Sequence, residues 1–157
     1  MLSVSNLDIG LTVSFTNECI DILKNNRRYN DETESGGLLF AKPLVGEKIA
    51  ISKISLPNKK DKSGKYFFIP DTTASQSEIN RQFEMNLAYI GDWHTHPTSS
   101  PRPSPKDIST IKKIFRESTH CLNYTLMIII GTSNEFSDNY FCLTDGKVIY
   151  ELSPQNN

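Results

Sequence analysis

The sequence has few cysteines and no long apolar run. Its three cysteines, Cys19, Cys121 and Cys142, are widely spaced. Such a set predicts neither a disulfide framework nor a cysteine zinc knuckle, so we expect free thiols in a reducing compartment. The longest aliphatic run, residues 126–130, is far too short to cross a membrane. The first residues lack the basic and apolar regions of a signal peptide, and we expect a cytoplasmic protein.

An excess of charge of either sign is also missing. The formal net charge is −1 at pH 7, which gives no general attraction to nucleic acid or to an anionic membrane, and we expect neither as a partner. A hydrophobic fraction of 37% and a charged fraction of 22% are typical of a globular chain. With 157 residues and no internal repeat, we predict one domain over residues 1–157 with a frayed tail at 153–157.

The hydrophobic periodicity predicts strands mixed with two or three helices. Apolar alternation or apolar runs favour strands near residues 11–15, 35–40, 49–56, 66–69, 87–93, 124–131, 139–143 and 148–152. Helical spacing favours helices near residues 17–26, 73–86 and 104–118, and the polar stretch 57–65 is expected to be an exposed loop. A break in alternation at Ser52-Lys53 predicts a bulge, and Asp145-Gly146 predicts a hairpin. The mixture indicates an α/β or α+β sandwich.

Two of the three histidines lie at a spacing that suits a metal ion. His94 and His96 follow the predicted strand 87–93, and a period of two places both imidazoles on one face. A catalytic zinc ion takes three protein ligands and leaves a position for water. Asp107 supplies the third ligand if the loop with its four prolines folds back and holds a fixed geometry. Two histidines at this spacing favour a metal over hydrogen-bonded surface side chains, whereas His120 is expected to have a structural or surface role.

The segment that contains Asp107 has a second interpretation. Ser104, Pro105 and Asp107 form a typical helix start, with serine as the N-cap, proline at the first helical position and an acid in the first turn. Capping explains the local pattern as well as metal binding does. One turn can serve both roles, so both interpretations are kept.

The stretch from His94 to Asp107 resembles the JAMM motif of the MPN/JAB superfamily of zinc isopeptidases. The match consists of His94-Thr95-His96-Pro97, six intervening residues and then Ser104-x-x-Asp107. Members carry an upstream glutamate, often as Glu-x-Gly-Gly, and Glu34-Ser35-Gly36-Gly37 corresponds to it. Glu32 lacks this context. Without the resemblance, Glu34 would be read as a solvated loop carboxylate.

The resemblance implies a fold and a set of roles. It implies a single JAMM/MPN domain with a curved mixed β-sheet flanked by helices, similar to the cytidine deaminase architecture. It also implies that Glu34 moves the proton of the attacking water and that Ser104 stabilises the oxyanion. By alternation, Thr95 and Trp93 point away from the metal, while Asp92 either orients a ligand or lies at the surface. Manganese or iron could occupy such a site instead of zinc.

The run from Gly91 to Pro97 is similar to a bacterial branch of this superfamily, Prok-JAB, which often has glutamate where Asp92 stands. That branch includes the deconjugating peptidase of CBASS antiphage operons. There the resemblance implies cleavage after the C-terminus of a cGAS-like nucleotidyltransferase that an E1–E2 fusion has attached to target lysines. Related enzymes act on a ubiquitin-like or sulfur-carrier protein. A non-catalytic MPN scaffold stays open, as does a Cys–His hydrolase built on His120 and Cys121.

Overall fold

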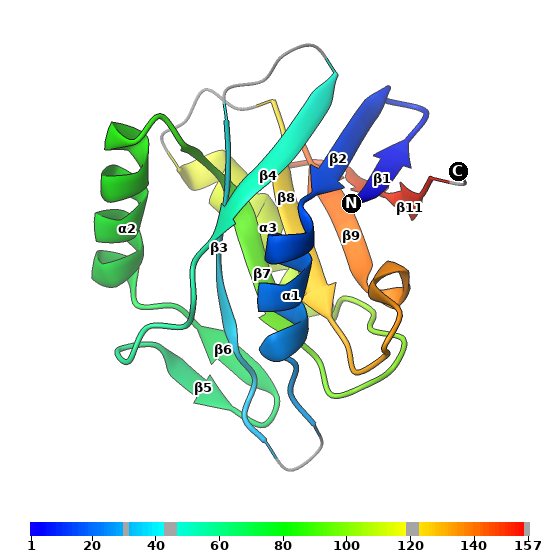
Figure 1. Cartoon of the computed structure of the whole chain (residues 1–157). Coiled ribbons are helices and arrows are strands. Elements are labelled where there is room, and N and C mark those ends of the chain that lie inside the picture. Colours follow the sequence, from blue (N-terminus) through cyan, green and yellow to red (C-terminus); the bar gives the residue numbers. More distant parts are fainter. Residues whose placement is uncertain (30–31, 43–46, 119–122, 156–157) are drawn as a thin grey trace.

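The structure is a computed structural model that describes residues 1–29, 32–42, 47–118 and 123–155. Figure 1 shows a strongly curved, nearly barrel-like sheet with helices on its faces. Nine strands pair in the order β10-β9-β8-β7-β3-β4-β2-β1-β11, and β5 and β6 form a separate hairpin. The sheet is mixed, because β7 runs parallel to β8 and antiparallel to β3. His120 and Cys121, which carried two of the predictions, lie outside the described residues.

The elements follow one another along the chain without an internal repeat. The strands are β1 (Leu2–Asn6), β2 (Leu11–Phe15), β3 (Gly36–Ala41), β4 (Lys48–Ile54), β5 (Lys62–Gly64), β6 (Phe67–Ile69), β7 (Ala88–Thr95), β8 (Thr125–Ile130), β9 (Tyr140–Thr144), β10 (Ile149–Glu151) and β11 (Ser153–Pro154). The helices are α1 (Asn17–Asn25), α2 (Thr72–Glu84), α3 (Pro105–Glu117) and the short 3-10 turn η1 (Phe136–Asp138).

Apolar side chains cover both faces of the central strands. Helix α1 lies on one face and adds Cys19 and Leu23 to the main core, while α3 lies on the opposite face and adds Ile111 to a second cluster that contains Met127 and Ile129 of β8 (Figure 1). Every residue of β8 is buried, as expected for a strand covered on both faces. Strand β7, which lies next to β8, is therefore held rigidly at the centre of the sheet.

Several sequence predictions are confirmed. Helix α1 begins after Thr16, whose hydroxyl oxygen accepts a hydrogen bond from the Cys19 backbone N–H at 3.2 Å. The predicted bulge in β4 is present, since Phe40 pairs with Lys53 and Ala41 pairs with Ile51, which leaves Ser52 without an opposite residue. The hairpin at residues 145–146 joins β9 to β10.

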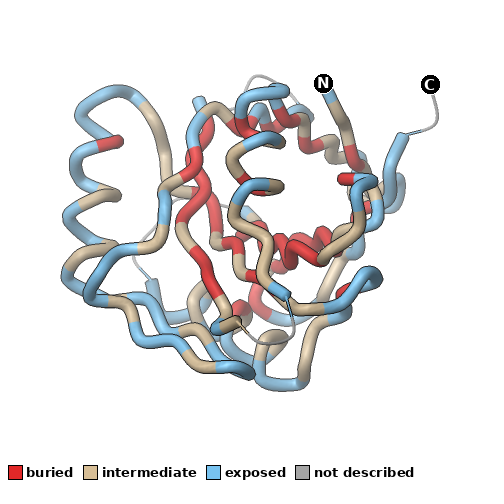
Figure 2. The backbone as a smooth tube through the Cα atoms, turned by 60° about the horizontal axis from the view of Figure 1, so that its bottom comes forward, coloured by how far each residue is buried: buried red, intermediate tan, exposed pale blue. Residues whose placement is uncertain are grey.

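Two expectations about the surface are wrong in part. Residues 57–65 are mostly exposed, as predicted, but they are not a loop throughout, because Lys62–Gly64 form β5, which pairs with β6. The tail is not frayed throughout, since Ser153 and Pro154 pair with β1. Helix α2 lies close to the predicted range, residues 73–86. That helix is exposed or half-buried along almost all of its length (Figure 2), and its one buried residue is Gln82.

No helix in the described part of the chain is both long and apolar enough to span a membrane.

Candidate metal centre

The end of β7 presents two imidazoles on one face of the sheet. His94 lies opposite Ile129 of β8, on the face that α3 covers, and His96 follows directly after the strand. The ring centroids of the two histidines are 5.1 Å apart. Trp93 and Thr95 point to the other face, where they are 1% and 0% exposed, as their predicted structural roles require.

Backbone contacts fix the loop that follows His96. The His96 N–H donates to the Ile130 carbonyl at 3.0 Å, and the Thr98 N–H donates to the His96 carbonyl at 2.9 Å. The Thr98 carbonyl in turn accepts from the Thr132 N–H at 2.8 Å. A Cβ atom on Gly131 would collide with the Thr98 carbonyl oxygen, so this close approach needs glycine. The loop is therefore anchored to the end of β8, in addition to being stiffened by its prolines.

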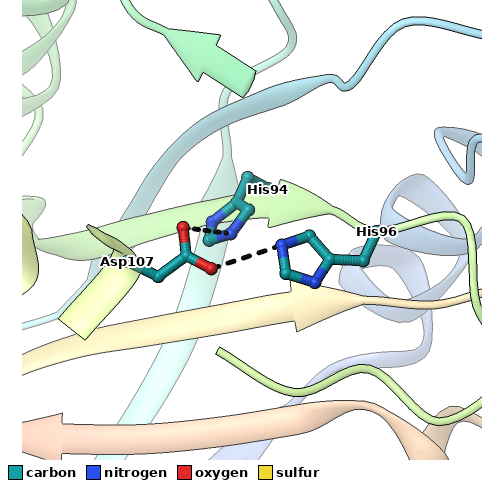
Figure 3. A group of neighbouring side chains, drawn as sticks. All are labelled: His94, His96 and Asp107. Carbon is teal, nitrogen blue, oxygen red and sulfur yellow. Dashed lines mark ion pairs between the residues drawn. The ribbon is translucent and has the colours of Figure 1, made fainter. Parts of the chain in front are cut away.

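The loop returns to the histidines at the start of α3. Ser104 is the N-cap, and its hydroxyl oxygen accepts from the Asp107 N–H at 3.0 Å. The Asp107 carboxylate accepts from the Ser104 N–H at 2.9 Å, which completes a capping box. The same carboxylate faces both histidines, as Figure 3 shows. The helix start and the proposed ligand position therefore coexist in one residue.

The three side chains lie close enough together to bind one ion. His94 Nε2 lies 3.3 Å from Asp107 Oδ1, and His96 Nε2 lies 3.3 Å from Asp107 Oδ2 (Figure 3). One ligand atom from each residue lies within 4.8 Å of the other two, and two imidazoles with one carboxylate are a usual set of ligands for zinc. His94 Nε2 is also buried without a hydrogen-bond partner, which a metal ion would supply.

The electrostatics of the group agree with this geometry. Burial alone would raise the pKa of Asp107, but the two imidazoles beside it, the charge of His94 and the hydrogen bond from the Ser104 N–H hold that pKa far below its usual range. Burial works to lower the pKa of His96, but hydrogen bonding to Asp107 and the charges of Asp107 and Glu34 raise it overall. The site therefore carries a carboxylate that attracts cations, whether the cation is a proton on imidazole or a metal ion.

Two glycines and a threonine bring Glu34 to the same place. A Cβ atom on Gly36 would lie 2.5 Å from the Phe68 ring, and one on Gly37 would collide with the Ser55 carbonyl, so both positions need glycine. The Thr95 hydroxyl oxygen accepts from the Ser35 N–H at 2.9 Å, and the Glu34 N–H donates to the Gly64 carbonyl at 2.8 Å. These bonds tie the chain around Glu34 to β7 and to the β5–β6 hairpin.

Glu34 lies on the same cavity as His94, His96 and Asp107, the metal-ligand group, and close enough for their charges to act on its carboxyl group. Burial raises the pKa of Glu34, and the neighbouring histidines oppose this shift only in part. A carboxyl group with a raised pKa is better suited to accept and release a proton near neutrality. A glutamate placed this way can work as a general base on a water molecule held at the centre.

A cavity of about 500 Å³ opens beside these residues. Glu34, Ser104 and the three residues of the metal-ligand group lie along it, together with residues that the sequence did not single out. Tyr66, Phe67 and Phe68 of the hairpin form one wall. The opposite wall comes from α3, with Ile111 and Ile114. No motif signals these lining residues, because their contribution depends on how the hairpin and α3 pack around β7.

Asp92 is not a surface residue, although that was one of its two predicted roles. It lies half-buried in the cavity wall, and the Tyr89 hydroxyl donates a hydrogen bond to its Oδ2 atom at 2.8 Å. Burial raises the pKa of Asp92 to about 6, although the bond from Tyr89 lowers it in part. The other predicted role, orienting a metal ligand, stays a prediction: the charge of His94 acts on the Asp92 carboxyl group, but among the described residues no hydrogen bond joins the two.

With this geometry in view, a family comparison decides the classification. The family model for prokaryotic homologues of the JAB domain, Prok-JAB, matches residues 17–142. The chain belongs to this family. The matched range contains the predicted site residues, from Glu34 to Asp107.

Curated relatives of this Prok-JAB chain carry peptidase names. A protein named "CD-NTase/cGAS isopeptidase" from Escherichia coli is 33% identical over 81 residues, 50% of this chain and 51% of that protein. The chain thus aligns with about half of that relative's length. A "Probable metalloprotease y4qB" from Sinorhizobium fredii is 30% identical over 113 residues, 69% of this chain and 68% of the relative. A second "CD-NTase/cGAS isopeptidase", from Vibrio cholerae, is 32% identical over 101 residues, 62% of each.

A solved structure agrees with the fold. The solution structure of protein DSY2949 from Desulfitobacterium hafniense superposes with a TM-score of 0.67 at 17% identity, covering 90% of each chain. At this identity the likeness concerns the fold alone. It extends the agreement beyond the motif to nearly the whole sheet.

Proposed function

We propose that this chain is a zinc-dependent isopeptidase that cleaves after the C-terminus of a protein conjugated to target lysines. The observation that carries the proposal is the convergence of His94, His96 and Asp107, whose ligand atoms lie within 4.8 Å of one another, with Glu34 on the same cavity. Two imidazoles and one carboxylate leave a coordination position free for water, as hydrolysis requires.

We assign a role to each residue of the proposed site from its place on the cavity. His94, His96 and Asp107 would hold the ion, and a bound zinc ion would supply Lewis acidity and lower the pKa of a water molecule. Glu34 takes a proton from the attacking water and delivers it to the leaving amine. Ser104 lies on the same cavity, and its oxygen accepts from Asp107 N–H, so its hydroxyl hydrogen is free to be donated to the developing oxyanion.

The names of the relatives support a specific substrate. Because two of the relatives described above are named CD-NTase/cGAS isopeptidases, we propose a cGAS-like nucleotidyltransferase of a CBASS system as the conjugated protein, with an E1–E2 fusion as the enzyme that attaches it. The cavity is open along the hairpin and α3, and an extended C-terminal tail could enter there. We place this reaction in the cytoplasm.

A reconstituted conjugate tests this proposal. A cGAS-like nucleotidyltransferase is attached to a lysine-bearing protein by an E1–E2 fusion and is then incubated with the zinc-loaded chain. We expect release of the nucleotidyltransferase with its original C-terminus, seen by intact-mass spectrometry, and loss of release after chelation. A conjugate that stays intact, beside a ubiquitin-like conjugate that is cut, would contradict the substrate assignment but leave the peptidase chemistry standing.

A further inference from the structure

A bulge in β7 turns an unexpected side chain, that of Tyr89, toward Asp92. Leu39 pairs with Gly91 and Phe40 pairs with Tyr89, so Ile90 has no opposite residue on β3. Ile90 joins the main core together with Trp93, and Tyr89 is thereby turned to the face of Asp92. Bulges next to active sites commonly re-aim a side chain in this way. Strict alternation would have placed Tyr89 on the face of Trp93.

Asp92 shares its face of the strand with His94 and lies two residues before it. At about 3.3 Å per residue, the two Cβ atoms are about 7 Å apart along the strand. Asp92 pairs with Met127 of β8, and Ile111 and Ile114 of α3 cover the cavity on this side. The carboxyl group is thus placed in an otherwise apolar part of the cavity, one side-chain length from the metal-ligand group.

The hydrogen-bonding capacity of Asp92 is mostly unused. Tyr89 supplies one donor to Oδ2, whereas an ionised carboxylate can accept about four. Within the described ranges, no lysine or arginine forms an ion pair with Asp92, although Lys106 also lines the cavity. A half-buried carboxylate among apolar side chains costs free energy unless a donor or a cation reaches it.

We propose that Asp92 is a specificity-determining residue that selects a substrate side chain with an unbranched apolar stem and a cationic end. Such a side chain, found in lysine and arginine, would lay its stem against Ile111, Ile114 and Met127 and bring its charge to Asp92. This inference rests on the proposed peptidase function. Two substrate positions could provide the side chain: a residue of the conjugated tail, or a residue that flanks the target lysine.

Small metal-directed probes test the subsite without the natural substrate. Hexanohydroxamic acid and 6-aminohexanohydroxamic acid share a zinc-binding head and a carbon chain, and only the second ends in an ammonium group. Their affinities for the zinc-loaded protein are measured by calorimetry for the wild type, for Asp92→Asn and for the exposed control Asp8→Asn. Asp92→Asn keeps an acceptor for the Tyr89 hydroxyl and removes the charge.

The expected result is a preference that depends on one carboxylate. The wild type and Asp8→Asn bind the amino probe about 10- to 100-fold more tightly than the alkyl probe, as a charge-assisted contact provides. In Asp92→Asn this ratio falls to about one. Shorter amino probes, with four or five carbons, lose the preference in the wild type, a result that stands even if Asp92→Asn fails to fold. Equal affinities of the two six-carbon probes for the wild type would overturn the inference.

Substrate peptides then show which side of the scissile bond supplies the cationic side chain, and they test the Asp92 inference separately from the proposed peptidase function. Isopeptide substrates with lysine or norleucine at each position beside the scissile bond give the ratio of kcat/KM values. We expect a preference for lysine on one side of the scissile bond, and we expect Asp92→Asn to abolish it. A preference on the tail side would assign the cationic side chain to the conjugated tail, and one on the target side would assign it to a residue that flanks the target lysine. Hydrolysis with no such preference at any position would remove the Asp92 inference and leave the proposed function. Failure of both hydroxamates to bind would contradict the metal centre and this inference together.

Discussion

Asp107→Asn, compared with Ser104→Ala, separates metal binding from helix capping. In the capping box, the Asp107 carboxylate accepts from the Ser104 N–H, and the amide oxygen of asparagine can take over that bond. We therefore expect the metal-free Asp107→Asn protein to lose at most about 1 kcal/mol of stability. The negative charge that lies 3.3 Å from each imidazole is lost completely. Because changes outside the ligand shell already cost 10- to 100-fold in affinity, we expect more than about a hundredfold weaker zinc binding.

Ser104→Ala should have the opposite profile. It removes the acceptor for the Asp107 N–H, which costs about 1 kcal/mol and lowers Tm by about 2–4 °C in a chain of this size. It leaves the three ligand side chains in place, so we expect zinc affinity within about tenfold of the wild type.

Two measurements on each variant check this pair of outcomes. Zinc affinity is obtained by competition with a chromophoric chelator, and the stability of the metal-free protein is obtained from thermal unfolding. Wild-type zinc affinity in Asp107→Asn, together with a loss of stability as large as that of Ser104→Ala, would show that Asp107 is only a helix cap.

Three other predictions follow from the contacts around the site. The pKa of His96 is raised, so protonated His96 pairs with Asp107 and stabilises the metal-free protein below about pH 6.5, and this stability is lost as the pH rises through the raised pKa. Because the proton must leave before a metal binds, zinc affinity should increase between about pH 6 and pH 8. A flat pH profile in chelator competition would be inconsistent with ligation by His96. Thr95→Val leaves the buried Ser35 N–H without an acceptor, so it should lower the free energy of unfolding by about 2 kcal/mol, lower Tm by about 4–8 °C and reduce kcat. An unchanged Tm in thermal unfolding would argue against this hydrogen bond. Gly131→Ala should displace the loop at Thr98 and weaken zinc binding at least about tenfold. The control Gly10→Ala, at an exposed position where φ is +66°, should lower stability only. Equal zinc affinities of the two variants would refute the anchoring role of Gly131.

The local sequence was sufficient to predict the elements that hold the metal-ligand group. His94, His96 and Asp107 are brought together as the spacing predicted, because a central strand fixes the first two and a capped helix start fixes the third. The bulge at Ser52 was also visible, since it interrupts the apolar alternation of β4. These features depend on periods and caps within a few residues, which a single sequence displays.

Features that depend on distant partners could not be read in this way. Strand β11 has only two residues and exists because β1 offers an edge, and β1 itself was not predicted. The bulge at Ile90 leaves no mark in the apolar pattern, so the orientation of Tyr89 toward Asp92 was missed. Each of these cases was decided by tertiary packing and not by local preference.

The proposed reaction depends most directly on Glu34, which lies on the same cavity as the metal-ligand group without belonging to it. The decisive measurement is the hydrolysis rate of an isopeptide conjugate by wild type and by Glu34→Gln, each with its zinc content determined on the same sample. We predict one zinc ion per chain in both proteins and a rate about 100- to 10,000-fold lower in Glu34→Gln, the usual contribution of a general base. A zinc-loaded Glu34→Gln protein that cuts the conjugate at the wild-type rate would contradict the account.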